Sequence, residues 1–462
     1  MLDARPVVLL SNRGPLSFSL DETGEPVAKR GAGGLVSGLT PLVAGTDAVW
    51  VAAALSEGDR VAAARGVVDA EDLRVRVLAV DPDTYRAAYD VVCNATLWFV
   101  HHGLFDAARR PRLDRRWAQA WDAYRAVNDA FADAAAETAP EGAAVLVQDY
   151  HLCLVAPRLR AARDDLRLVH FSHTPFAPPE WFRALPDAAA NELLGGLAAN
   201  HACTFHSQRW GDAFRACCRA FGIEPPTTGV TPLAVDLDDL DDVGSSDACV
   251  AAGGDLDARL AGRRALVRVD RVELSKNLLR GFHAYELLLE ERPEWREQVV
   301  FAALVYPSRE GLSEYVAYGQ EVEGLVRRIN ERWATDTWTP VLYDTDDDFP
   351  RSVAALQRAD VLLVNPIRDG LNLVAKEGMY LNQRDAVLVL STEAGAWDEL
   401  APAGAVGVNP FDVAAQADAL HEALSMPVDE RAKRAASLRA VVTARRPADW
   451  LAEQLALAEP RQ

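Results

Sequence analysis

Residues 368–377 are the stretch of the sequence whose residue types are best suited to binding a ligand, and they include the acidic residues Asp369 and Glu377. The stretch follows an apolar run at residues 360–365 that predicts a buried parallel strand, and it leads into a predicted helix. Backbone N–H groups and the helix dipole favour an anion at such a junction. Because both carboxylates can accept hydrogen bonds from sugar hydroxyls beside that anion, the pattern predicts a nucleotide-sugar site. The competing interpretation is an ordinary strand–turn–helix with a solvated glutamate.

Cations follow two other predicted strands in the second half of the chain. Arg271 and Lys276 come after the strand predicted at residues 265–269, and Arg309 comes after the one at 299–305. Two cations at this place would neutralise a leaving diphosphate, which is the largest single need in glycosyl transfer from a nucleotide sugar. Taken alone, they could equally be solvated surface charges.

A glycine-rich segment follows the first predicted strand. The strand at residues 7–10 leads to Arg13, and Arg-Gly-Ala-Gly-Gly-Leu occupies residues 30–35. Glycines let the backbone approach a phosphate closely, and an arginine can bind it with two hydrogen bonds. Val36 stands where the dinucleotide fingerprint requires its last glycine, which argues against an NAD site. Each segment by itself is also compatible with a plain turn and a surface arginine.

A carboxylate and an imidazole end two further predicted strands. Asp149 follows the strand at residues 144–147, and His173 follows the next one at 166–171. The carboxyl ends of parallel strands lie at one edge of a sheet, so both side chains could face the same cleft. A single histidine in such a setting is more often a core residue. The two strand-end motifs in register favour His173 over His170 as the functional one.

Short apolar runs alternate with longer amphipathic segments along the whole chain. The predicted strands lie at residues 7–10, 49–53, 144–147, 166–171 and 203–205, and then at 265–269, 299–305, 361–364 and 386–390. Helical patterns lie between or after them, for example at 117–136, 312–333 and 413–425. The alternation predicts an α/β fold with two facing Rossmann-like domains on parallel sheets, and an active site in the interdomain cleft.

An acidic segment rich in glycine and serine, residues 236–254, separates the two series of strands. We therefore expect an N-terminal Rossmann-like domain at 1–240 and a C-terminal Rossmann-like domain at 241–445. The last helical pattern, at 447–459, is expected to pack back across the junction. Residues 446–462 would then form a C-terminal helix that crosses to the N-terminal domain.

Composition describes a globular chain of 462 residues with a net charge of −20, which argues against a nucleic-acid partner. The six cysteines show neither a C-x-x-C pair nor a zinc spacing, the N-terminus lacks a leader pattern, and no apolar run is long enough to cross a bilayer. These features predict a cytoplasmic protein with reduced thiols and no membrane partner. The acidic run at 344–348 fits neither an aspartyl-phosphatase motif nor a calcium loop, and we expect no metal and no cofactor.

Taken together and in order, these motifs resemble the trehalose-6-phosphate synthase family, the retaining two-Rossmann glycosyltransferases of family 20. The resemblance runs from residue 7 to residue 442. It rests on Ser-Asn-Arg at 11–13, Gly-Gly-Leu at 33–35, Tyr89 with Asn-Ala-Thr-Leu-Trp at 94–98, Asp-Tyr-His-Leu at 149–152, His-Thr-Pro-Phe at 173–176, Arg271 with Lys276, Arg309, and residues 369–377. One of these motifs alone is weak, whereas the ordered set is specific.

The resemblance implies transfer of glucose, with retention, from a nucleoside diphosphate glucose to glucose 6-phosphate, which gives an α,α-linked product. By carry-over, the acceptor would be held by Arg13, Tyr89, Trp98, Asp149 and Arg309. The donor would be held by Gly34, Arg271, Lys276, Asp369, Gly370, Leu371, Asn372, Leu373 and Glu377. The catalytic residues would be Asp149, His173, Arg271 and Lys276.

The implied mechanism is front-face attack without a protein nucleophile, in which the acceptor hydroxyl gives its proton to the departing phosphate. The sequence departs from the family pattern at 271–277, where Arg-Val-Glu-Leu-Ser-Lys-Asn replaces Arg-Leu-Asp-Tyr-x-Lys-Gly, and in the acidic run before Phe349. An acidic lining of the base pocket would favour guanine, whose N1–H and amino group are donors, over uracil. Both UDP-glucose and GDP-glucose therefore stay open as donors.

Other functions are also open at this point. One is a related transferase with another acceptor, such as a glucosylglycerol-phosphate synthase or a cyclitol pseudo-glycosyltransferase, and another is a non-catalytic sugar-phosphate sensor. The acceptor set favours a hexose phosphate, Asp369 argues against the pseudo-transferase, and Arg271 with Lys276 argues against the sensor. The sequence leaves the oligomeric state undecided, a homo-oligomer included.

Overall fold

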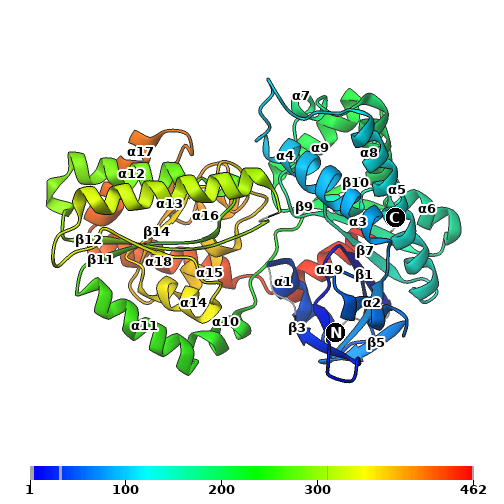
Figure 1. Cartoon of the computed structure of the whole chain (residues 1–462), viewed down its shortest axis with the longest axis horizontal. Helices are drawn as coiled ribbons and strands as arrows, with labels where there is room; N and C mark the ends of the chain where they lie inside the picture. Colours follow the sequence, from blue (N-terminus) through cyan, green and yellow to red (C-terminus); the bar gives the residue numbers. More distant parts are fainter. Residues whose placement is uncertain (1–4, 31–33, 310, 460–462) are drawn as a thin grey trace. The chain divides into compact units, whose positions relative to one another are not determined.

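The computed structural model describes residues 5–30, 34–309 and 311–459 of the chain. The chain forms two compact units (Figure 1). The first comprises Met1–Ala234 with Pro447–Gln462, and the second comprises Val235–Arg446. Each unit has its own sheet with helices on both faces. Among the described residues, no helix combines the length and the apolar character needed to span a membrane.

An eight-stranded sheet forms the centre of the first unit, in the order β10-β9-β8-β7-β1-β4-β6-β5. All neighbouring strands pair in parallel except β5 and β6, which are antiparallel. The strands are β1 (Val7–Ser11), β4 (Val49–Ala53), β5 (Val67–Ala70), β6 (Leu73–Leu78), β7 (Ala144–Gln148), β8 (Arg167–Ser172), β9 (Ala202–Phe205) and β10 (Thr227–Val230), and a separate hairpin pairs β2 (Leu16–Leu20) with β3 (Pro26–Arg30). Strands β1, β4 and β7 are buried along their whole length, as both covered faces require.

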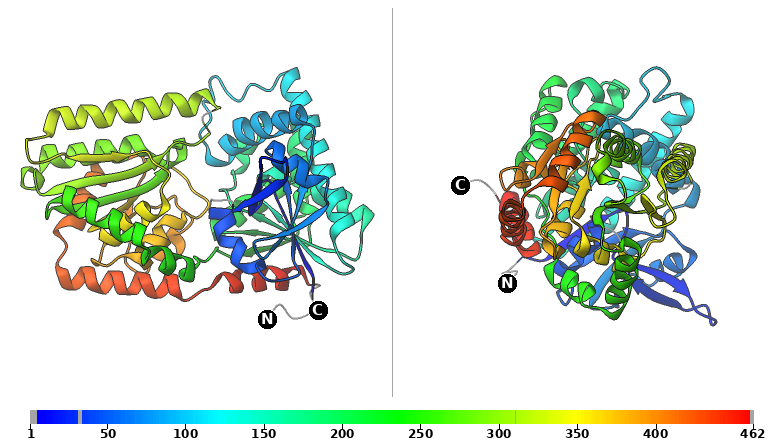
Figure 2. Two further views of the ribbon diagram at one scale, coloured as in Figure 1. Left: turned by 60° about the horizontal axis from the view of Figure 1, so that its bottom comes forward. Right: turned by 90° about the vertical axis from the view of Figure 1, so that its left-hand side faces the viewer.

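The last helix of the chain belongs to this first unit. The helices here are α1 (Gly34–Val43), α2 (Glu57–Ala63), α3 (Pro82–Arg86), the π-helix η1 (Ala87–Leu97), α4 (Trp98–His102), α5 (Arg115–Thr138), η2 (Tyr150–Leu152), α6 (Val155–Ala162), α7 (Pro179–Phe182), α8 (Asp187–Ala198), α9 (Gln208–Ala220) and α19 (Pro447–Ala458). Trp450 of α19 is buried, with its ring 5.1 Å from that of Phe171 on β8. The left view of Figure 2 shows α19, in red, beside the blue elements of this unit.

A six-stranded, fully parallel sheet forms the second unit, in the order β13-β12-β11-β14-β15-β16. Its strands are β11 (Arg264–Arg271), β12 (Val299–Tyr306), β13 (Val341–Asp344), β14 (Val361–Val364), β15 (Val387–Ser391) and β16 (Val406–Val408). Its helices are α10 (Leu237–Gly244), α11 (Asp247–Leu260), η3 (Leu274–Lys276), α12 (Leu278–Glu291), η4 (Pro293–Trp295), α13 (Ser313–Trp333), α14 (Phe349–Arg358), α15 (Leu373–Leu381), α16 (Trp397–Leu400), α17 (Val413–Ser425) and α18 (Val428–Thr443). Figure 1 shows α12 and α13 on one face of this sheet and α11 and α14 on the other.

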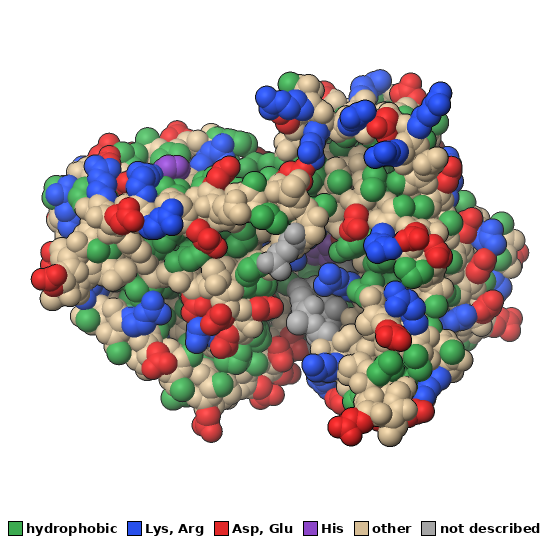
Figure 3. Space-filling model, in the orientation of Figure 1, with side chains coloured by type: hydrophobic (Ala, Val, Ile, Leu, Met, Phe, Trp, Pro, Cys, Tyr) green, Lys and Arg blue, Asp and Glu red, His purple; other side chains and the backbone are tan. Residues whose placement is uncertain are grey.

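The acidic segment that separates the two series of strands is helical. It forms α10 and α11, whose first turns are capped by the side chains of Asp236 and Ser246. Figure 3 shows acidic side chains gathered over these two helices. Despite its glycines and serines, this segment does not form one long loop. The side-chain caps satisfy N–H groups in the first turn of each helix.

The order of the strands places a switch point in each sheet. In the second unit, β11 lies between β12 and β14, because the chain adds strands on one side of β11 and then crosses to the other. In the first unit, β1 lies between β4 and β7 for the same reason. Ligands of open α/β sheets bind at the carboxyl ends of the strands beside such a point. The α/β fold with parallel sheets predicted from the sequence is confirmed.

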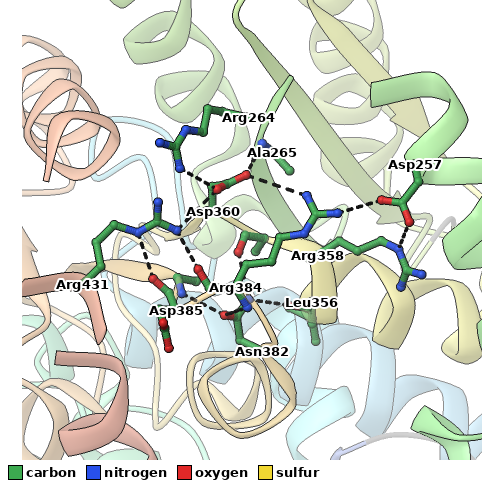
Figure 4. Close-up of polar contacts among 12 residues, drawn as sticks. Asp257, Arg264, Ala265, Leu356, Arg358, Asp360, Asn382, Arg384, Asp385 and Arg431 are labelled. Atoms are coloured by element: carbon green, nitrogen blue, oxygen red, sulfur yellow. Dashed lines mark hydrogen bonds and ion pairs between the residues drawn. The ribbon is translucent and has the colours of Figure 1, made fainter. Parts of the chain in front are cut away.

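An ion-pair network closes the opposite, amino end of the second sheet (Figure 4). Asp360, just before β14, accepts hydrogen bonds from Arg264 Nη1 and from the backbone N–H of Ala265, both at 2.9 Å. The nearly buried Arg431 of α18 reaches the same carboxylate at 3.3 Å. One aspartate thus ties two strands and a helix together at the end remote from the carboxyl edge.

Candidate active site

Lys276 and Asp369 form an ion pair at the carboxyl ends of the adjacent strands β11 and β14. Lys276 Nζ lies 2.7 Å from Asp369 Oδ2 and 3.7 Å from Asp270 Oδ1. Burial by itself lowers the pKa of Lys276, but the neighbouring carboxylates outweigh burial and raise the pKa above its usual value. The structure therefore places a permanent cation at the switch point of the second sheet.

Arg271 is the last residue of β11 and lies on the same edge. Its Nη2 is 3.0 Å from Glu273 Oε1, and its side chain is 48 % exposed whereas that of Glu273 is 3 % exposed. The buried carboxylate therefore holds the guanidinium from one side, and the exposed part of the side chain can meet a ligand. An arginine fixed in this way offers several N–H donors to a phosphate.

A buried polar network holds the backbone and the carboxylates next to these two cations. The fully buried Arg268 donates to Asp270 Oδ2 at 2.9 Å, and its Nη2 donates to the carbonyl of Lys276 and to Asn365 Oδ1, both at 2.6 Å. Asn277 donates to the carbonyl of Asn365 at 3.0 Å. Its φ of 60° is one that asparagine tolerates, so the glycine of the family pattern is not needed at this position.

The loop from Asp369 to Leu373 leads into α15 and carries the backbone N–H groups of a helix N-terminus. Asn372, with φ 78°, caps the helix by accepting from the N–H of Ala375, and its amide donates to Asp369 Oδ2 at 3.2 Å. Gly370, Leu371 and Asn372 are buried, and Leu373 is half-buried. These N–H groups and the adjacent Lys276 make this loop suited to an anion.

Glu377 lies one turn into α15 and is half-buried. Burial raises the pKa of Glu377 to about 7, the carboxylate of Asp239 on α10 adds to this rise, and Lys276 opposes it. A carboxyl group with such a pKa is poised to change its charge near neutral pH. It can also accept hydrogen bonds from hydroxyl groups.

Arg309 follows β12 in a left-handed backbone conformation, with φ 49°. Its Nη1 donates to the hydroxyl of Tyr315 at 2.6 Å, and its guanidinium lies 5.5 Å from the centre of that ring. Arg271 pairs in register with Tyr306, the last residue of β12, and Arg309 follows three residues later, so both cations lie at the carboxyl edge of the sheet. The structure thus brings Arg271, Lys276, Arg309 and Asp369 to one end of the second unit.

In the first unit, Asp149 and His173 follow the neighbouring strands β7 and β8. The backbone N–H of His173 donates to Asp149 Oδ1 at 3.1 Å, and Asp149 has φ 68°. His173 Nε2 lies 2.9 Å from Gln148 Oε1. Burial lowers the pKa of His173 to about 3, with His170 adding to the effect, so the imidazole is neutral at pH 7.

The three other residues of the first unit that were predicted to bind the acceptor differ in exposure. Arg13, two residues beyond β1, is exposed, and Tyr89 of η1 is half-buried with its ring stacked 5.8 Å from that of His151. Trp98 is only 2 % exposed and stacks on His102 at 4.2 Å. The fold therefore leaves Arg13 and part of Tyr89 accessible, whereas Trp98 is packed in the core of η1 and α4.

Half of the glycine-rich segment, residues 31–33, lies outside the described residues. Gly31 and Gly33 fall there, so the prediction for this loop stays a prediction. Gly34 is the first residue of α1. A ligand at the start of α1 would meet the N-terminus of this helix.

The acidic run before Phe349 is partly neutralised by one arginine. Arg351 of α14 lies 2.7 Å from Asp344 Oδ2 and 3.2 Å from Asp346 Oδ2. Among the residues that the structure describes, no group of three or more His, Cys, Asp or Glu side chains is arranged to hold a metal ion. Phe349 is 44 % exposed at the start of α14 and offers an apolar face beside this run.

Several residues of the site were not predicted from the sequence. Arg268, Asp270 and Asn365 form the support of Lys276, and Glu273 holds Arg271. In the first unit, Tyr85 donates to Asn12 Oδ1 at 2.8 Å and stacks on Tyr89 at 5.6 Å. Charged residues inside an apolar strand, such as Arg268 and Asp270, were the available signal, because buried charges need partners.

The chain has two α/β units, each built on a mainly parallel sheet, and the second unit presents cations and a carboxylate beside a helix N-terminus. This combination is typical of glycosyltransferases with two Rossmann-like domains. The chain belongs to glycosyltransferase family 20, whose model matches residues 5–459. The resemblance noted in the sequence is thereby confirmed at the level of the family, and the protein is an enzyme of the glycosyltransferase class.

Known relatives span nearly the whole chain. The UDP-forming alpha,alpha-trehalose-phosphate synthase of Schizosaccharomyces pombe is 30 % identical over 93 % of this chain and 85 % of its own length. The trehalose-6-phosphate synthase of Mycolicibacterium vanbaalenii is 32 % identical over 95 % of this chain and 92 % of its own. The structure also matches an E. coli protein bound with UDP-2-fluoro glucose (TM-score 0.86, 26 % identity, 99 % of each chain) and the Burkholderia xenovorans synthase in complex with glucose 6-phosphate (TM-score 0.85, 27 % identity, 98 % of this chain and 100 % of that one).

Proposed function

We propose that this chain transfers glucose with retention from UDP-glucose to glucose 6-phosphate and releases UDP and α,α-trehalose 6-phosphate. The observation that carries the proposal is the Lys276–Asp369 pair before the N-terminus of α15, with Arg271 at the carboxyl end of β11, at the switch point of the second sheet. Named relatives of the same family are UDP-forming synthases of this product. Both the local chemistry and the family therefore support the same reaction.

The donor would be bound by residues of the second unit and the N-terminus of α1. Arg271 and Lys276 would bind the diphosphate together with the N–H of Gly34, and the loop from Gly370 to Leu373 would hold phosphate and glucose. Asp369 would bind glucose hydroxyls and Glu377 the ribose. Lys276 is already paired with Asp369, so the loop is preorganised for the ligand.

The acceptor would be bound by Arg13, Tyr89, Trp98 and Asp149 of the first unit and by Arg309 of the second. Arg13, Tyr89 and Arg309 would bind its phosphate. Trp98 is buried in this structure, and its part in the proposal would be to shape the wall behind Tyr89.

The chemistry we propose is front-face attack. The acceptor hydroxyl would lose its proton to the departing phosphate while Arg271 and Lys276 stabilise the negative charge that develops there. His173, held neutral by burial, would act near the reaction centre as a hydrogen-bonding group and not as a cation. Asp149, which receives the N–H of His173, would line the same centre.

The donor base is the finer part of the proposal. Arg351 pairs with two of the aspartates before Phe349, which weakens the argument that an acidic pocket selects guanine. The UDP-forming relatives also favour uracil. We therefore propose UDP-glucose as the donor, with GDP-glucose as the alternative.

The compartment is part of the proposal as well. The six cysteines all lie among the described residues, where they are buried and form no disulfide, and burial raises the pKa of several of their thiols, for example that of Cys153 to about 12. Reduced thiols are typical of reducing compartments. These features support a cytoplasmic enzyme.

The test is the release of nucleoside diphosphate from UDP-glucose and from GDP-glucose, each with and without glucose 6-phosphate. Acceptor-dependent release of UDP supports the proposal, and acceptor-dependent release of GDP alone would replace the donor. Binding of glucose 6-phosphate without any turnover would favour the sugar-phosphate sensor. Turnover only with glycerol 3-phosphate would favour a transferase with another acceptor.

A further inference from the structure

The donor loop of α15 rests on a second segment of the chain, residues 393–399. The N–H of Asp369 donates to the carbonyl of Glu393 at 3.2 Å, the N–H of Gly395 donates to the carbonyl of Asp369 at 3.0 Å, and the N–H of Ala396 donates to the carbonyl of Leu371 at 2.8 Å. The contact is so close that a Cβ on Gly395 would lie 1.8 Å from the carbonyl oxygen of Gly370. The two backbones are therefore in direct contact and joined by three hydrogen bonds.

A buried ion pair joins the same two segments one turn further on. Lys376 of α15 places Nζ 2.8 Å from Glu399 Oε1 and 3.0 Å from Oε2, and its side chain is only 4 % exposed. Lys376 precedes Glu377, and successive residues of a helix project about 100° apart. Lys376 therefore faces α16, while Glu377 faces Asp239 and Lys276.

We propose that Lys376 and Glu399 are a positioning pair that fixes the first turn of α15 against α16 and so sets the N–H groups of Gly370 to Leu373 for the donor diphosphate. This inference rests on the proposed function of the loop. The geometry favours this proposal because the Lys376 ammonium lies near both carboxylate oxygens of Glu399. Two such contacts fix both the separation and the orientation of the two side chains, whereas a single backbone hydrogen bond fixes one contact. A lysine is rarely buried unless such a partner is present.

The alternative is an ion pair that only stabilises the fold, and the chain offers a matched control for it. Arg431 is a nearly buried cation in the same unit, and it is paired with Asp360 (Figure 4). This pair lies at the amino end of the sheet, whereas the donor loop follows the carboxyl end of β14. Lys376→Met and Arg431→Met each remove one buried cation from a carboxylate, and Asp360 keeps its second cation, Arg264. A general loss of stability affects both variants alike, whereas loss of positioning affects only Lys376→Met.

The experiment compares KM for UDP-glucose, KM for glucose 6-phosphate, kcat and the thermal midpoint in the full-length wild type and both variants. We expect Lys376→Met to raise the donor KM about tenfold or more and to leave the acceptor KM within about twofold. Arg431→Met should lower the thermal midpoint and leave both KM values near those of the wild type. An unchanged donor KM in Lys376→Met, or an equal rise of the donor KM in both variants, overturns the proposal.

Two additions keep the test decisive. If Lys376→Met does not fold, the double variant Lys376→Met with Glu399→Met removes both charges, which a buried site tolerates better than a lone charge. A raised donor KM in this double variant supports the proposal, and a wild-type KM overturns it. If the wild type shows no turnover, the proposed function fails separately, and calorimetric Kd values for UDP and GDP in the same variants replace the donor KM.

Discussion

Glu377 offers the sharpest test of the electrostatics of this site. Burial raises the pKa of its carboxyl group from the ordinary value of 4.5 to about 7. The protonated form is favoured in the folded chain, so the wild type loses stability as pH rises from the unfolded pKa through the folded one. Below about pH 4.5 the carboxyl group is protonated in both the folded and the unfolded state, and this loss of stability is absent.

The magnitude follows from the two pKa values. A difference between 4.5 and about 7, at about 1.4 kcal/mol per pH unit, corresponds to a loss of about 3 kcal/mol once pH exceeds 7. Glu377→Gln has no such titration. We therefore expect the free energy of unfolding of the variant, relative to the wild type, to increase by about 3 kcal/mol between pH 4.5 and pH 8.

The assay is urea denaturation of both proteins, followed by tryptophan fluorescence at several pH values between 4.5 and 8. Any constant effect of the substitution cancels, because only the change of the difference with pH is used. Glu422→Gln, at an exposed position of α17, controls for the loss of one carboxylate. A difference between Glu377→Gln and the wild type that stays constant over this range would refute the account of a buried, uncharged carboxyl.

Three further outcomes follow from the described contacts. Gly395→Ala should lower kcat/KM for the donor by about 100-fold, because its Cβ would meet the carbonyl of Gly370 at 1.8 Å, and steady-state kinetics would reveal a wild-type value if the loop can yield. Asp360→Ala should cost about 3 kcal/mol or more in the free energy of unfolding while kcat stays within about twofold, and a denaturation midpoint equal to that of the wild type would contradict the network of Figure 4. The imidazole of His173 should stay neutral from pH 5 to pH 8, so its ¹⁵N NMR shifts should not change, and a titration near pH 6.5 would contradict the lowering of its pKa by burial.

The strands and the chemistry at their ends could be predicted because they leave local signals. Apolar runs bounded by polar residues marked β1, β7, β11 and β14, and the residues just beyond each run were the candidates for binding. The fully buried central strands of a parallel sheet give such runs, since both faces are covered. The strands of the two main sheets that were not predicted are β5, β6, β10, β13 and β16. Four of them are short edge strands, and β6 alternates between buried and half-buried residues, so none shows a long continuous apolar run.

The acidic segment at 236–254 shows the opposite case. Its glycines and serines indicated a separator between domains, yet it forms α10 and α11. The caps are local, but the burial of Leu240 and Cys249 depends on residues distant in sequence, such as Gln357, whose Oε1 lies 3.7 Å from Cys249 Sγ. Composition alone does not contain that information.

The sequence by itself determined the fold class, the family and the residue types that we propose for binding an anion and a sugar. Spacing within one strand–loop–helix unit is local, so it can be read from consecutive residues. Only the tertiary structure decided which residues support these candidate binding residues. Arg268 and Asn365 are 97 residues apart and meet under Lys276, and Lys376 meets Glu399 23 residues later. Such pairs form because a charge removed from water must find a partner inside the fold, wherever the chain happens to place one.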